Sequence, residues 1–159
     1  MKPEEKLLLL CEDRQLNLGL AESCTGGSFA ARLTQIPGAS RCFAGSIVSY
    51  QDQVKTKVLG IPQQILKQKG AVNEEVALKM LEGALFQLGA DIAASVTGIA
   101  GPDGGTLETP VGTVYLAIGG KQFQTKVTRL DLTGNRIEII QKTIDWAIIQ
   151  LIEMVQSSA

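Results

Sequence analysis

Hydroxyl and thiol side chains follow the first apolar segment of the chain, where residues 21–27 read AESCTGG. The pattern around this stretch predicts a strand, a tight turn and a new helix. We expect Ser23, Cys24 and Thr25 to lie beside the unpaired N–H groups and the positive dipole end of that helix. Gly26 lets a ligand approach the backbone. A hydroxyl in such a turn is a candidate nucleophile with backbone N–H groups as oxyanion donors, or Ser23 or Thr25 only caps the helix.

Cys24 is a second candidate nucleophile in the same turn. A helix N-terminus lowers the pKa of a thiol, and this favours the reactive thiolate. The alternative is a small buried apolar side chain, which is the more frequent role of a free cysteine. The sequence leaves both roles open.

A nucleophilic serine needs a base, and the sequence contains no histidine. This absence excludes a Ser-His-Asp triad, a Cys-His dyad and every histidine-dependent metal site within the chain. Lys55 and Lys57 follow Tyr50 in a polar, helix-prone stretch. A lysine whose pKa is lowered by burial is a recognised substitute for histidine beside a serine. The alternative is that both lysines are solvent-exposed, as most lysines are.

A second glycine-rich stretch, residues 97–106, reads TGIAGPDGGT. It opens on Thr97, and its glycines are Gly98, Gly101, Gly104 and Gly105. It matches neither a Walker A loop nor the GxGxxG fingerprint, but its N–H groups can form an anion-binding nest. A long loop inside a compact domain favours a functional role, and the alternative is a plain surface connection.

Arg136 stands at a predicted helix start, after Gly134 and Asn135. Its planar guanidinium suits bidentate contact with a phosphate or carboxylate. The alternative is an ordinary exposed arginine. We therefore treat Arg136 as a candidate substrate-binding residue.

Helical and strand patterns alternate around these residues. Helices are predicted near residues 4–17, 26–35, 51–59, 63–68, 73–88 and 136–155, and strands near residues 18–22, 43–50, 91–96, 112–119 and 122–131. Asn73 is the expected N-cap of the long helix. The alternation predicts an α/β fold, a three-layer α/β/α sandwich around a mixed β-sheet. Ligands of such sheets collect beyond the carboxyl ends of the strands, where the Ser23 turn, the segment after Tyr50 and the Thr97 loop all start.

The composition is that of one globular domain over residues 1–159, with 45% apolar and 19% charged residues. A net charge of −1 without a basic run disfavours binding to nucleic acid. No apolar run is long enough to span a membrane, and the first residues make a poor signal peptide. Three widely spaced cysteines fit the reduced cytoplasm better than a disulfide framework.

Several of these segments together resemble the CinA carboxy-terminal domain family. The resemblance is carried by residues 21–27 (AESCTGG), residues 97–105 (TGIAGPDGG) and residues 110–115 (PVGTVY), and extends over roughly residues 5–150. The first two strings together are highly specific. The family includes nicotinamide-nucleotide amidohydrolase, and its domain also occurs as the last part of longer proteins.

The resemblance implies hydrolysis of nicotinamide mononucleotide to nicotinate mononucleotide and ammonia, with no cofactor and no metal. It implies that Ser23 is the nucleophile, that Lys55 rather than Lys57 is the base, and that the other family positions fall on Tyr50, Thr97 and Arg136. It also implies a homo-oligomer. The chain departs from the family pattern at Asn73, where serine is usual, and at Thr109, where a lysine is common.

Three other functions stay open on the sequence. The first is a nucleotide-binding or regulatory module without catalysis. The second is amide hydrolysis of another pyridine nucleotide or related metabolite by the same two residues. The third is a cysteine hydrolase that uses Cys24.

Overall fold

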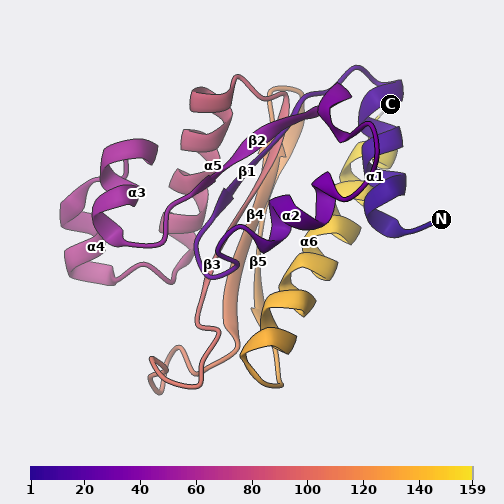
Figure 1. Ribbon diagram of the computed structural model, residues 1–159. Coiled ribbons are helices and arrows are strands. Elements are labelled where there is room, and N and C mark those ends of the chain that lie inside the picture. Colours follow the sequence, from indigo (N-terminus) through magenta and orange to yellow (C-terminus); the bar gives the residue numbers. More distant parts are fainter. Residues whose placement is uncertain (159) are drawn as a thin grey trace.

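Five strands form one mixed sheet in the computed structural model, which describes residues 1–158 (Figure 1). The strands are Leu18–Glu22 (β1), Phe43–Val48 (β2), Ile92–Gly98 (β3), Thr113–Gly120 (β4) and Phe123–Asp131 (β5). Their order is β2-β1-β3-β4-β5, with β1 parallel to both β2 and β3, and with β4 antiparallel to β3 and β5. The predicted mixed sheet is confirmed.

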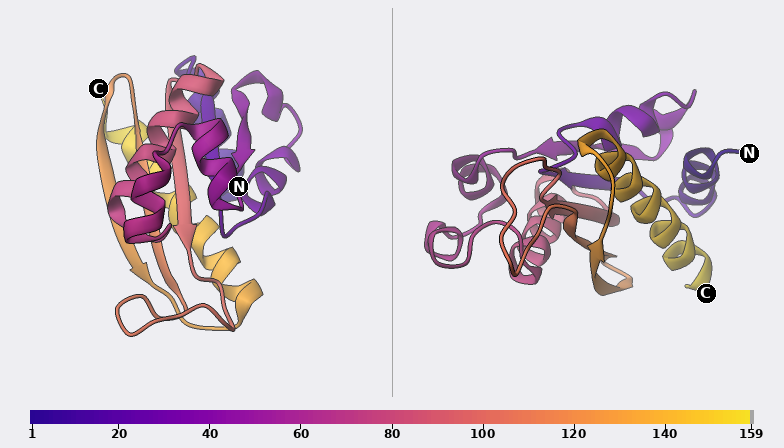
Figure 2. Two further views of the ribbon diagram at one scale, coloured as in Figure 1. Left: turned by 90° about the vertical axis from the view of Figure 1, so that its left-hand side faces the viewer. Right: turned by 90° about the horizontal axis from the view of Figure 1, so that it is seen from below.

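Helices cover both faces of this sheet (Figure 2). They are Pro3–Asp13 (α1), Ser28–Thr34 (α2), Asp52–Leu59 (α3), Gln63–Lys69 (α4), Glu74–Leu88 (α5) and Arg136–Ser157 (α6), with a short 3-10 turn at Ala39–Arg41. Helices α1, α2 and α6 lie on one face, and α5 lies on the other with α3 and α4 beside it. The three predicted layers are therefore confirmed. Within residues 1–158 no helix combines the length and the apolar character that crossing a membrane requires.

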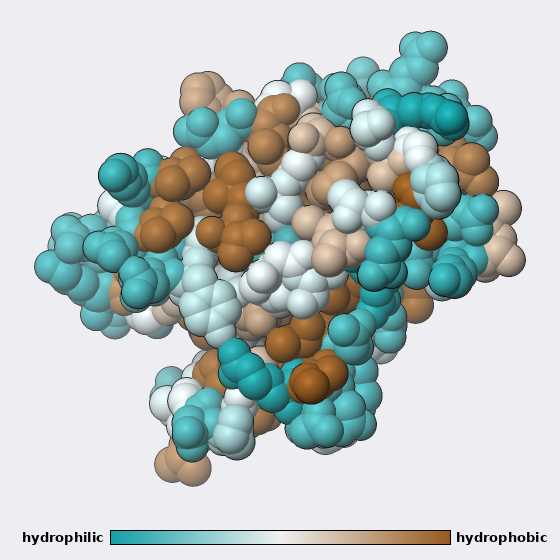
Figure 3. All heavy atoms as spheres, in the orientation of Figure 1, coloured by the Kyte–Doolittle hydropathy of each residue, from teal (hydrophilic) through white to brown (hydrophobic). Residues whose placement is uncertain are grey.

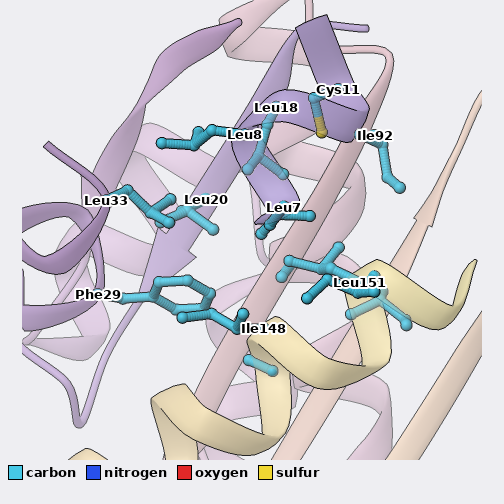
Figure 4. Packing of buried hydrophobic residues seen from close by; sticks show 14 of the residues in the cluster. Leu7, Leu8, Cys11, Leu18, Leu20, Phe29, Leu33, Ile92, Ile148 and Leu151 are labelled. Atoms are coloured by element: carbon cyan, nitrogen blue, oxygen red, sulfur yellow. The ribbon is translucent and has the colours of Figure 1, made fainter. Parts of the chain in front are cut away.

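The buried strand β1 divides the core in two, because alternate side chains point to opposite faces. Leu18 and Leu20 pack with α1, α2 and α6, in the cluster that Figure 4 shows around Phe29 and Leu151. Ala21 faces the other way and packs with α5. By the same alternation Glu22 points toward the α2 face, and it is completely buried.

Element ends differ from the predictions by a few residues. The first helix ends at Asp13 rather than at residue 17, since Gln15 adopts a φ of +56°. The helix after the serine turn begins at Ser28 rather than at residue 26, because Gly26 and Gly27 have φ values of +56° and +99°. Asn73 caps α5 as predicted, by accepting a hydrogen bond from the Val76 N–H at 2.9 Å.

Candidate active site

The candidate residues gather where the parallel strands β1 and β3 end. Glu22 pairs with Val96 in the sheet register, so the Ser23 turn starts beside Thr97. Thr97 and Gly98 are the last two residues of β3 rather than the start of the loop, because both pair with β4. Figure 1 shows the turn after β1, the long loop after β3 and the first turn of α6 at this lower end of the sheet. The site is thus built from connections that rigid strands and helices hold in place.

A cavity of about 270 Å³ lies between these segments. Most of the candidate residues line it: Ser23, Cys24, Tyr50, Lys55, Thr97, Gly98, Gly101, Gly104 and Arg136. Asp52 and Asp103 also line it, together with apolar residues of the glycine-rich loop and of the segment before α5. The volume approaches the range of about 300–1,000 Å³ that is typical of small-molecule pockets.

Three candidate binding residues lie outside this cavity lining. Thr25 is buried, and its hydroxyl donates to Glu22 Oε1 at 2.7 Å. Gly26 lies in the turn next to the ring of Tyr50. Gly105 packs against the backbone of Val111, where a Cβ atom would come within 2.7 Å of the nitrogen. These positions shape the turn and the loop and do not face the cavity.

Lys55 is a buried lysine whose side chain is only 1% exposed. Its Nζ donates to the carbonyl oxygens of Ser49, at 2.8 Å, and Tyr50, at 3.3 Å. Burial lowers the pKa of Lys55, and the Asp52 carboxylate 3.9 Å away opposes this effect. Lys57, two residues later, is exposed. Of the two lysines that the sequence offered as a base, only Lys55 is therefore buried in the cavity lining.

Ser23 is fixed through its backbone while its hydroxyl is unpaired. Its N–H donates to the Val96 carbonyl at 3.1 Å, and its carbonyl accepts from the Gly26 N–H at 3.0 Å. Within residues 1–158 the hydroxyl forms no hydrogen bond, not even with the Lys55 amine that lines the same cavity. The two groups thus line the same cavity without a hydrogen bond between them.

Arg136 joins the two sides of the cavity. One guanidinium nitrogen donates to the Gly101 carbonyl at 2.6 Å, and another donates to the Tyr50 hydroxyl at 2.7 Å. Arg136 is the first residue of α6, which Asn135 and Glu138 hold with a capping box. Tyr50 therefore contacts both basic residues of the cavity lining, Lys55 through its carbonyl oxygen and Arg136 through its hydroxyl.

Glu22 is the residue of the site that the sequence interpretation missed. Its buried carboxylate accepts from the Gly27, Phe29 and Ala30 N–H groups, so it caps α2. The expectation that Ser23 or Thr25 caps this helix is wrong, because the N-cap position is Gly27 and carries no side-chain cap. These N–H groups are also not free to bind a substrate oxyanion. An acid at the end of an otherwise apolar strand was the signal in the sequence.

Of the two roles that the sequence leaves open for Cys24, the structure favours the buried apolar one. Burial raises the pKa of this thiol to about 12, since the residue is almost inaccessible to water. The thiol's own backbone N–H opposes the effect, and the Glu22 carboxylate adds to it. The N-terminus of α2 does not lower the pKa of this thiol, because its N–H groups already donate to the Glu22 carboxylate. Cys24 is thus a protonated, buried thiol beside Ser23.

Known proteins that share this architecture include both curated relatives and solved structures. A "CinA-like protein" of Geotalea uraniireducens is 51% identical over 130 residues, which are 82% of this chain and 31% of the relative. A "CinA-like protein" of Geobacter sp. is 49% identical over 133 residues, 84% of this chain and 32% of the relative. The chain therefore spans about a third of the length of these relatives.

Solved structures match nearly the whole chain. The competence damage-inducible protein A of Klebsiella pneumoniae superposes with a TM-score of 0.94 at 32% identity, covering 99% of this chain and 97% of that one. A competence/damage inducible protein of Agrobacterium tumefaciens gives a TM-score of 0.89 at 35% identity, covering 97% and 96%. The CinA C-terminal domain matches residues 1–155. The chain belongs to the CinA C-terminal domain family.

Proposed function

We propose that the protein is an amidohydrolase that deamidates nicotinamide mononucleotide, with Ser23 as the nucleophile and Lys55 as the base. The observation that carries this proposal is a buried lysine and an unpaired serine hydroxyl lining one cavity in a chain without histidine. Membership of the CinA family supports the substrate through the resemblance of the site strings.

Lys55 acts as a base only when its amine is neutral. A neutral amine has two N–H groups and one lone pair, and the carbonyls of Ser49 and Tyr50 accept two N–H bonds from Nζ. The lone pair then stays available for the Ser23 proton. Ser23 and Lys55 line the same cavity, and we expect their hydrogen bond to form when the substrate binds, because catalytic hydrogen bonds often tighten only in the substrate complex.

The reaction runs through an acyl-enzyme. Lys55 accepts the Ser23 proton, and the hydroxyl oxygen bonds to the carboxamide carbon. The protonated amine then gives this proton to the amide nitrogen, which leaves as ammonia when the C–N bond breaks. Water, deprotonated by Lys55, then releases nicotinate mononucleotide and restores Ser23. Cys24 supplies a candidate oxyanion donor, because its N–H donates to no other residue within residues 1–158. Such a donor is worth about 3–4 kcal/mol of barrier.

The nucleotide part is held at the other side of the cavity. Arg136 lines it with a planar guanidinium that suits a phosphate, and the loop carrying Gly101 and Gly104 brings backbone close to the ligand. Thr109, where the family commonly has lysine, lines a neighbouring cavity and bonds to Thr106. The phosphate contact therefore rests on Arg136.

Replacement of the nucleophile tests the proposal. Ser23→Ala removes the attacking oxygen, so we expect ammonia release from nicotinamide mononucleotide to fall by roughly 10⁴-fold or more. Ser40→Ala, in the short turn after α2 and away from the cavity, is the matched control and retains wild-type activity. Undiminished ammonia release by Ser23→Ala would remove the nucleophile assignment.

A second function is favoured by one observation. The Lys55 amine donates to two carbonyl oxygens and has no hydrogen bond to Ser23, as in a pocket that binds a nucleotide without reacting. Incubation of the wild-type protein with nicotinamide mononucleotide separates the two functions. Unchanged nucleotide bound after a long incubation supports a binding module, whereas nicotinate mononucleotide in solution supports the hydrolase.

A further inference from the structure

The Glu22 carboxylate is surrounded by hydrogen-bond donors and by no cation within residues 1–158. Its Oε1 accepts from the Thr25 hydroxyl at 2.7 Å, the Gly27 N–H at 3.2 Å and the Phe29 N–H at 2.9 Å. Its Oε2 accepts from the Ala30 N–H at 3.2 Å and the Ser46 hydroxyl at 2.7 Å. Burying a carboxylate is costly unless its oxygens are satisfied, and here five donors satisfy them.

These donors come from three segments near Ser23. Thr25 and Gly27 belong to the serine turn itself, Phe29 and Ala30 to the first turn of α2, and Ser46 to the neighbouring strand β2. One carboxylate thus ties the turn to the helix after it and to the strand beside it. The Glu22 side chain does not line the cavity, so it touches no substrate.

We propose that Glu22 is the positioning residue of the nucleophile, because its carboxylate fixes the turn that aims the Ser23 hydroxyl into the cavity. This inference rests on the proposed role of Ser23 as nucleophile. The same carboxylate also occupies the N-terminus of α2, where its negative charge faces the positive end of the helix dipole.

Glu22→Gln is the sharpest variant, because it keeps the size of the side chain and removes the charge. An amide in this place has one oxygen and one NH₂ group, so at least one of the Ala30 or Phe29 N–H groups loses its acceptor. We expect the turn to loosen, with kcat falling by about 10- to 100-fold, the cost of a misplacement near 1 Å. The KM is expected to change by less than about threefold, since Glu22 touches no substrate.

Two readouts separate positioning from a purely structural role. The first is the split between kcat and KM for ammonia release, measured on folded protein. The second is the rate at which a fluorophosphonate probe labels Ser23, followed by intact-protein mass spectrometry with Ser23→Ala as the blank. Ser95→Ala is the matched control, because it also deletes a buried hydrogen bond, to the Ala77 carbonyl at 2.6 Å, on the opposite face of the sheet. We expect it to keep wild-type kcat and labelling.

The outcomes are distinct. Glu22→Gln that is folded and matches the wild type in both kcat and labelling overturns the inference. If Glu22→Gln does not fold, Thr25→Val decides, because it deletes only the hydroxyl bond to Oε1. Unchanged labelling of Thr25→Val overturns the inference, and slower labelling supports it. A wild-type protein that is labelled faster than Glu22→Gln but releases no ammonia refutes the proposed substrate and leaves the role of Glu22 standing.

Discussion

The protonation state of Lys55 is the property of a single residue on which the proposed chemistry depends most. Its amine has lost almost all contact with water, and this burial lowers its pKa. The Asp52 carboxylate at 3.9 Å pulls in the opposite direction by favouring the ammonium form. The balance between the two decides how much of the protein holds a neutral base at a given pH.

Removal of Asp52 tests this balance through the pH dependence. The rate is expected to rise with pH as Lys55 loses its proton, so the acid limb of the kcat/KM profile follows the lowered pKa of Lys55 in the free protein. Asp52→Asn removes the group that raises this pKa, and the acid limb moves to lower pH. Asp103→Asn, another acid of the cavity lining, is the control and leaves the limb in place. An acid limb that stays unchanged, or moves to higher pH, in Asp52→Asn contradicts this assignment.

The residues of the site differ in how far the sequence could predict them. Ser23 and Thr97 lie at the carboxyl ends of strands, and Lys55 lies in the helix that follows a strand. The rule that ligands bind at the carboxyl ends of strands is enough to predict that these three residues lie together. The role of Glu22 was not predicted, because it depends on hydrogen-bond donors that are distant in the sequence. Ser46 is one of them, and only the pairing of β1 with β2 brings it near Glu22. The sequence left the role of Cys24 open between a reactive thiolate and a buried thiol, because the burial that raises its pKa is a property of the folded chain.

At the scale of elements, the position of Lys55 depends on how closely α3 approaches α5. Gly83 of α5 lies against the end of α3, and a Cβ atom at this position would come within 2.6 Å of the Leu59 carbonyl oxygen. The crossing therefore needs a residue without a side chain on α5, at Gly83. Because Lys55 belongs to α3, the close packing of α3 on α5 also determines where Lys55 lies relative to the ends of the strands.

Gly83→Ala separates helix propensity from packing. In an isolated helix alanine is more stable than glycine by about 1 kcal/mol. Here we expect the reverse, a loss of about 1–3 kcal/mol of unfolding free energy, because the added methyl group pushes α3 away from α5. We also expect kcat to fall with the displacement of Lys55. Gly89→Ala, at the exposed C-cap of the same helix, is the control for kcat alone. Its φ of +59° makes alanine destabilising there too, but no atom of residues 1–158 lies near its Cβ position, so α3 stays in place and kcat stays at the wild-type level. A stabilised, fully active Gly83→Ala would contradict the role of this crossing.

The sequence predicted the elements well and their ends less well. Apolar periodicity located every strand, and Asn73 marked the start of α5. The start of α2 was predicted too early because glycines at positive φ extend the turn, and the tertiary cap from Glu22 has no local pattern.

At the scale of the whole molecule, alternation of helix and strand was sufficient to predict the three layers. The predicted homo-oligomer stays a prediction. Figure 3 shows hydrophobic atoms between hydrophilic ones on the face that it presents. Within residues 1–158 Phe86 and Ile137 are 83% and 70% exposed, and β2 is an edge strand. Light scattering coupled to size-exclusion chromatography measures the number of subunits directly.

The central claim is that the buried amine of Lys55 takes the place of an imidazole, and one comparison tests it most directly. Ammonia release from nicotinamide mononucleotide is measured for the wild type, Lys55→Met and Lys57→Met, which changes the exposed lysine two residues away in the same helix. A general base contributes about 10²–10⁴-fold, so Lys55→Met is predicted to lose at least about 100-fold in kcat while it stays folded. Lys57→Met is predicted to keep wild-type activity. A folded Lys55→Met with kcat within about threefold of the wild type, well below any general-base contribution, would contradict the claim.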